Sequence, residues 1–150
     1  MNFISSEMLP LVLAFVSGVL MAVQGSINTG LSKVIGLLEA TFVVHLTGTI
    51  LVMLLLFIGN LGKGNLSTWQ EAPWYSWLGG ILGVAIIYLV AASIPSVGVA
   101  NATTAIIVGQ VLTAIIIDYL GGFGLERMAY SPKQALGLVL LAVGARLLLK

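Results

Sequence analysis

The stretch that decides the fold is residues 9–28, LPLVLAFVSGVLMAVQGSIN, which contains no charged residue. About 20 consecutive apolar residues are the length that an α-helix needs to cross the hydrocarbon core of a bilayer. The whole chain has the same character, because 59% of its 150 residues are hydrophobic and only 7% are charged. A soluble domain carries about 25% charged residues. We therefore expect an integral membrane protein.

Further apolar runs of similar length follow, separated by segments rich in Gly, Pro, Ser and Asn. They are too long and too uniformly apolar for the alternating strands of a β-barrel. We predict an all-α membrane protein in which residues 1–150 form a single integral membrane domain with five transmembrane helices. The predicted spans are residues 9–28, 40–59, 74–94, 98–119 and 132–149.

The segments between the runs contain residues that typically begin or end helices. The polar and glycine-rich residues 29–36 are expected to end the first helix. Pro95 and Gly98 are expected to separate the third helix from the fourth. Ser131 followed by Pro132 is typical of an N-cap residue and the first helical position.

The composition argues against several classes of function. The chain has no cysteine and one histidine, so we expect no metal site and no disulfide. A net charge of +1 offers no basic surface for a nucleic acid. The sequence contains no paired acids, nucleophile–base set or phosphate-binding glycine loop of an enzyme. We therefore expect neither enzyme activity nor a cofactor.

The basic residues are divided evenly between the two sides of the membrane. Five spans place the ends of the chain on opposite sides, which we call side A (the N-terminal side) and side B. An excess of basic residues on one side normally orients a membrane protein, and here there is no excess. Either a helix is misplaced, or the chain inserts both ways and pairs with an inverted copy of itself as an antiparallel homodimer of ten helices. Side A has Lys63, Arg127 and Lys133, and side B has Lys33, Arg146 and Lys150.

Small residues recur at a spacing of four on several of the predicted helices. Lipid provides no hydrophobic drive for helix association, so close backbone approach at small residues carries much of the packing. We expect helix packing at Ala14, Gly18 and Ala22 in the first helix, Gly79 and Gly83 in the third, and Gly109 in the fourth.

Polar residues at membrane depth point most directly to a function, because they usually face a partner helix or a water-filled cavity. They gather in the side-B half of four predicted helices, and Gln24 and Asn28 share one helix face. We expect a polar vestibule that opens to side B, with Gln110 near its floor. The alternative is hydrogen bonding between helices without a cavity. The candidate substrate-binding residues are Gln24, Asn28, His45, Asn101, Thr103, Thr104 and Gln110.

Glu39 and Asp118 are the only acids expected at membrane depth, and both lie near the end of a predicted helix. They are the candidates for ion or proton coupling. Proton-coupled antiport usually needs a carboxylate deep in the path, where its pKa is raised, and no predicted span has one there. The coupling mechanism therefore stays open.

Several short motifs occur in a fixed order: Gln24-x-x-x-Asn28-x-x-Leu31, Trp77-x-Gly79-Gly80, Gly109-Gln110 followed by Asp118-x-x-Gly121, and the segment from Leu125 to Lys133. Together these motifs resemble the YdcZ family, also called DUF606. The resemblance covers nearly the whole chain and implies a drug/metabolite transporter (DMT) superfamily member in the bacterial inner membrane. It also implies dual-topology ancestry, in agreement with the even distribution of basic residues.

The resemblance does not extend to the proton/cation exchange of small multidrug resistance proteins. Those relatives carry a central glutamate in their first helix, and this sequence has Gly18 and apolar neighbours at that depth. We expect a dual-topology transporter that moves a small polar or amphipathic solute by alternating access across the dimer. Its partners would be the inverted copy, the lipid bilayer and the small-molecule substrate. The alternative is a structural or accessory membrane protein without a transport path.

Overall fold

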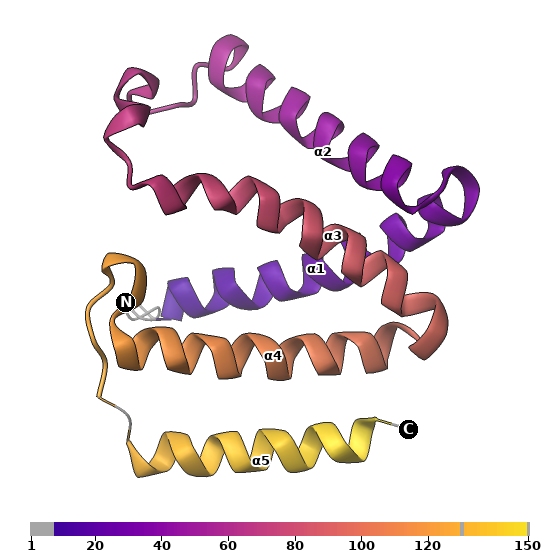
Figure 1. Cartoon of the computed structure of the whole chain (residues 1–150), viewed down its shortest axis with the longest axis vertical. Helices are drawn as coiled ribbons and strands as arrows, with labels where there is room; N and C mark the ends of the chain where they lie inside the picture. Colours follow the sequence, from indigo (N-terminus) through magenta and orange to yellow (C-terminus); the bar gives the residue numbers. More distant parts are fainter. Residues whose placement is uncertain (1–7, 130, 150) are drawn as a thin grey trace, which may run out of the picture. The chain divides into compact units, whose positions relative to one another are not determined.

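The computed structural model describes residues 8–129 and 131–149, and these residues contain helices and no strand (Figure 1). A π-helical turn, η1 (Leu54–Ile58), continues the second α-helix, and three short 3₁₀ helices lie in the connections: η2 (Leu66–Glu71), η3 (Trp74–Trp77) and η4 (Gly122–Gly124). The α-helices are α1 (Met8–Ile35), α2 (Leu37–Met53), α3 (Leu78–Val97), α4 (Val99–Leu120) and α5 (Pro132–Leu148).

Four helical segments among the described residues are long and apolar enough to cross a membrane. Their apolar side chains are largely exposed; Phe15, for example, is 73% exposed. Such exposure suits lipid as the surrounding solvent, so the predicted all-α membrane protein is confirmed. The 17 residues of α5 are not among the four segments, and a fifth crossing stays a prediction. The four are Met8–Ile35, Leu37–Ile58, Trp74–Val97 and Val99–Leu120.

The first helix extends beyond the predicted span of residues 9–28, because α1 continues to Ile35 and ends within residues 29–36, where its end was expected. Polar residues in this stretch form bonds that are compatible with the helix. The Thr29 hydroxyl donates to the Gly25 carbonyl at 2.8 Å, and the Ser32 hydroxyl donates to the Thr29 carbonyl at 2.9 Å. These hydroxyls need no water, and the helix therefore continues through them.

The prediction that Pro95 separates the third helix from the fourth is wrong. Pro95 lies within α3, which continues to Val97. Pro95 removes one backbone hydrogen bond of α3, and only two helical residues follow it. Gly98 separates α3 from α4, as predicted.

Two turns of a single glycine each connect consecutive helices. Gly36 joins α1 to α2 with φ 98° and ψ 158°, and Gly98 joins α3 to α4 with φ 84° and ψ 162°. This backbone region is essentially restricted to glycine. The Gly36 N–H still donates to the Ser32 carbonyl at 3.0 Å, and its carbonyl accepts from the Ala40 N–H at 3.0 Å. The chain therefore changes direction without leaving these backbone groups unpaired.

The same residue pattern follows both turns. Gly36 is followed by Glu39-Ala40-Thr41, and Gly98 is followed at the same spacing by Asn101-Ala102-Thr103. Both alanines are buried, at 1% exposure for Ala40 and 4% for Ala102. A small side chain at this position lets a neighbouring backbone come close to the start of α2 and α4.

The described helices form two compact units, Met1–Pro95 and Ser96–Lys150. In the first unit α1 approaches α3 at Gly25, where an added Cβ would lie 2.9 Å from Val90 Cγ1 and 3.3 Å from Ile94 Cδ1. The α2 helix approaches α3 where His45 Nε2 would lie 3.5 Å from a Cβ added at Gly83. Among the described residues of the unit, the buried ones gather where α1 ends, α2 begins and α3 ends: Gly25, Asn28, Thr29, Ala40, Thr41, Ala91 and Ile94.

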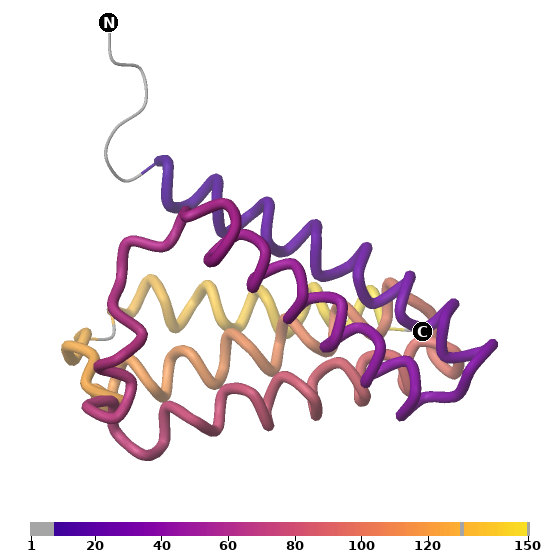
Figure 2. The backbone as a smooth tube through the Cα atoms, turned by 90° about the horizontal axis from the view of Figure 1, so that it is seen from above, coloured from indigo at the N-terminus to yellow at the C-terminus, as the bar shows by residue number. Residues whose placement is uncertain are grey.

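In the second unit α4 and α5 lie side by side and run antiparallel (Figures 1 and 2). The Ser131 Oγ accepts from the Gln134 N–H at 3.3 Å, and Gln134 Oε1 accepts from the Ser131 N–H at 2.8 Å. This reciprocal cap confirms the predicted start of the last helix at Ser131-Pro132. Gly121 ends α4 in the left-handed conformation, with φ 65° and ψ 40°.

Three of the glycines predicted to pack against another helix have empty space beside them in this single chain. A Cβ added at Gly18, Gly79 or Gly109 would meet no atom within 4 Å beyond its own helix backbone and chain neighbours. Packing of another helix against these glycines therefore stays a prediction.

We expect Gly36→Ala to destabilise the protein by about 1–3 kcal/mol, because alanine at this φ and ψ is strained. The added Cβ would also collide with the Glu39 carboxylate. Thermal unfolding in detergent measures the effect. Gly48→Ala in α2 is the matched control, since its added Cβ meets nothing within 4 Å and alanine favours a helix interior by about 0.5–1 kcal/mol. Equal stability of the two variants would contradict the strained turn.

Candidate functional site

Eight hydroxyl side chains in the helices bond to the backbone of their own helix. Each donates to a carbonyl three or four residues earlier, at 2.7–3.0 Å. These bonds satisfy the hydroxyls without a second helix and without water. Neither interhelical bonding nor a vestibule is therefore needed to explain them. The residues are Ser17, Ser26, Thr29, Ser32, Thr41, Thr47, Ser93 and Thr104.

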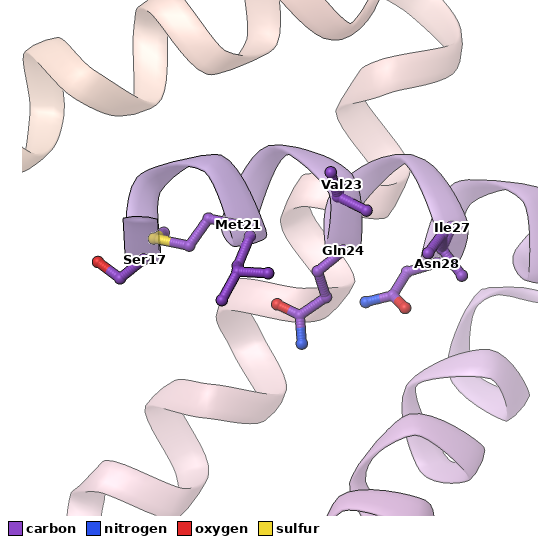
Figure 3. Close-up of a pocket in the computed structure, with 7 residues that line it drawn as sticks. Ser17, Met21, Val23, Gln24, Ile27 and Asn28 are labelled. Atoms are coloured by element: carbon purple, nitrogen blue, oxygen red, sulfur yellow. The ribbon is translucent and has the colours of Figure 1, made fainter. Parts of the chain in front are cut away.

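The predicted amide pair of the first helix lies in a groove on α1. The side chains of Gln24 and Asn28 extend to the same side of the helix, one beside the other (Figure 3). The groove has a volume of about 400 Å³ and a mostly apolar lining. Its lining residues are Ser17, Leu20, Met21, Val23, Gln24, Ile27 and Asn28. The groove thus combines an amide end with an apolar wall, a combination that would suit an amphipathic molecule.

Asn28 differs from the other polar residues of α1 because it is buried and unpaired. Its exposed fraction is 5%, whereas Gln24 is exposed. Within residues 8–129 and 131–149 its amide has no hydrogen-bond partner. A buried polar group left without a partner costs about 1–3 kcal/mol. A polar atom from outside the described chain would remove that cost.

His45 lies in α2 with one ring nitrogen bonded and the other directed at α3. Nδ1–H donates to the Thr41 carbonyl at 2.9 Å. In the neutral ring this bond leaves Nε2 as an acceptor, which faces α3 at Gly83. No cluster of three metal-ligating side chains occurs among the described residues. The bond to Thr41 and the contact with α3 place His45 between two helices of the first unit, and its role in binding a solute stays a prediction.

The remaining candidate binding residues belong to the second unit. Asn101, Thr103 and Thr104 lie in the first turns of α4 and are half-buried, and Gln110 is exposed near the middle of the helix. Their convergence with Gln24 and Asn28 of the first unit stays a prediction.

The two acids lie at helix ends, as their sequence positions predict. Glu39 is in the first turn of α2, where its carboxylate contacts Gly36 and complements the positive end of the helix dipole. Asp118 is in the last turn of α4, and its backbone carbonyl accepts from the Met128 N–H at 3.0 Å. A role of either carboxylate in coupling stays a prediction.

Sequence reasoning did not identify two features of the groove. Helix periodicity places Gln24 and Asn28 on one face but cannot say that Asn28 alone is buried. The apolar wall of Leu20 and Ile27 was also missed, because in a lipid-facing helix such residues look the same as any others. No pattern in the sequence distinguishes them.

We expect Asn28→Leu to stabilise the purified protein by about 1–3 kcal/mol, because the change removes an unpaired buried amide. Thermal unfolding in detergent measures it. Thr29→Val is the matched control: Thr29 is equally buried, at 4% exposure, but its hydroxyl is already bonded. This control should lose at most about 1 kcal/mol. A loss of stability in Asn28→Leu would show that the amide has a structural partner in the assembled protein.

A family described as "Putative inner membrane exporter, YdcZ" matches residues 9–147. No curated protein and no solved structure matches the chain. The matched range includes α2, α3 and α4, all but the first residue of α1 and all but the last residue of α5.

Proposed function

The chain belongs to the YdcZ family of the bacterial inner membrane, and from this premise we propose that it moves a small polar or amphipathic solute across that membrane by alternating access. The family description as an exporter gives the class of function. The residues that line the α1 groove indicate which kind of solute the protein would bind.

The observation that carries the proposal is the unpaired amide of Asn28 in the α1 groove. A solute with a hydroxyl or amide group would complete the hydrogen bonds of Asn28 and Gln24. Its apolar part would lie along Leu20 and Ile27. Asn101, Thr103, Thr104 and Gln110 would line the rest of its path in the assembled transporter.

The solute that fits this groove is uncharged or weakly charged. No residue that lines the groove carries a charge. Glu39 and Asp118, the acids expected at membrane depth, lie at helix ends and do not line the groove. A strong cation would therefore lack a counter-ion at the proposed binding position.

An antiparallel homodimer would supply the second half of the transport path. Five helices are few to enclose an aqueous path, and the evenly distributed basic residues allow insertion in both orientations. In this arrangement α5 would be the fifth crossing, because 17 helical residues span about 26 Å. Two inverted copies would present equivalent inward and outward openings.

The alternative is an accessory membrane protein in which the groove is covered by a dry partner helix. Both proposals use the same contacts of α1, and they differ in whether water reaches Asn28. The chain has no cysteine, so a single introduced thiol reports on water without further changes.

We expect the thiol of Asn28→Cys to react with a membrane-impermeant maleimide in vesicles, because a transport path admits water to the groove. Ser26→Cys is the control on the same helix, since Ser26 does not line the groove. Its thiol should react much more slowly. Mass spectrometry measures the labelled fraction. Protection of Asn28→Cys from the reagent, with denatured protein fully labelled, would favour the accessory protein.

We also expect a cysteine added at either end of the chain to be labelled from both sides of the membrane in whole cells and inverted vesicles. Dual insertion places each end on both sides in comparable amounts. Adding three lysines to the loop around Lys63 should shift the labelling to one orientation. Labelling of the unmodified chain from one side only would contradict the inverted dimer.

A further inference from the structure

The segment after α4 folds back over the C-terminal end of that helix. The Gly121 N–H donates to the Ile117 carbonyl, and the Met128 N–H donates to the Asp118 carbonyl at 3.0 Å. The Leu125 N–H donates to the Gly122 carbonyl at 3.1 Å. Backbone bonds thus hold residues 121–128 in a defined position at the end of a membrane-spanning helix.

Arg127 is fixed across this fold by its own side chain. Its Nε donates to the Leu120 carbonyl at 3.1 Å. Its Cγ lies over Gly121, where an added Cβ would meet it at 2.6 Å. In the described part of the chain the guanidinium makes no ion pair, although Asp118 and Glu126 are near in sequence. Within residues 8–129 and 131–149 the terminal N–H groups of Arg127 have no partner and no acid pairs with its positive charge.

The Arg127 side chain lines a pocket of about 360 Å³. Around the guanidinium the walls are apolar and exposed: Tyr119 is 65% exposed, Leu120 57% and Met128 64%. The other lining residue is Ala129. Because α4 ends here, the pocket lies at the level where a spanning helix reaches the lipid headgroups.

We propose that this pocket binds the phosphate of an anionic phospholipid headgroup. A guanidinium matches two phosphate oxygens with parallel N–H bonds. An acyl chain would cover the exposed apolar side chains beside it, which a free phosphate ion cannot do. The uncompensated charge of Arg127 favours a headgroup with net negative charge over a zwitterionic one.

The test compares the unfolding temperature of the protein in nanodiscs of phosphatidylcholine with and without phosphatidylglycerol. We expect phosphatidylglycerol to raise the unfolding temperature of the wild type. Arg127→Gln should lose most of this increment. Arg146→Gln makes the same change in charge at the end of α5, away from the pocket, and should retain the increment. Arg127→Lys, which keeps the charge but not the planar fork, should retain part of it.

The difference between the two lipid compositions separates lipid binding from helix capping. Arg127→Gln also loses its bond to Leu120, so its stability in phosphatidylcholine alone should fall. That loss is common to both compositions and cancels in the difference. An increment that is absent in the wild type, retained in Arg127→Gln, or lost equally in Arg146→Gln would overturn the proposal. So would an equal increment from inorganic phosphate added to phosphatidylcholine nanodiscs.

Discussion

The structure depends on one constraint, which is that lipid offers no hydrogen bonds to the backbone. Every polar group at membrane depth must find its partner within protein or a wet cavity. The single-residue turns at Gly36 and Gly98 meet this constraint, since in both turns the glycine carbonyl is paired with an N–H of the next helix. Eight serine and threonine hydroxyls meet it by bonding to their own helices. Helices and their ends are thus arranged around the pairing of polar groups.

Asn28 is informative because it does not follow this pattern. Its amide is buried in α1, and it has no partner within residues 8–129 and 131–149. An unpaired amide weakens the fold, and such a weakness persists in proteins where it serves binding. The neighbouring Gln24 and the apolar wall of the groove fit the same interpretation. The proposed solute would thus supply the hydrogen bonds that the chain itself leaves unmade.

The exposed apolar faces of the helices also need a partner outside the single chain. In a single chain most apolar side chains of α1 to α5 are uncovered, so lipid or another copy of the chain must cover them. The glycines with open positions, such as Gly18 and Gly109, are where a second backbone would come closest. At the end of α4 the covering molecule would be a phospholipid, because Arg127 provides a charge that another apolar helix would not use.

The sequence alone determined that the surrounding solvent is lipid, the helical class, the family resemblance, and the helix boundaries at Gly98 and Ser131. These features follow from transfer into lipid or from local backbone preference, which a linear pattern contains. Only the tertiary structure decided that α1 continues to Ile35, that α3 includes Pro95, and that Asn28 is buried while Gln24 is not. A helix continues wherever its polar groups remain paired, and burial depends on which helices lie alongside. The spacing of residues along one helix predicts neither the pairing of its polar groups nor the helices that lie beside it.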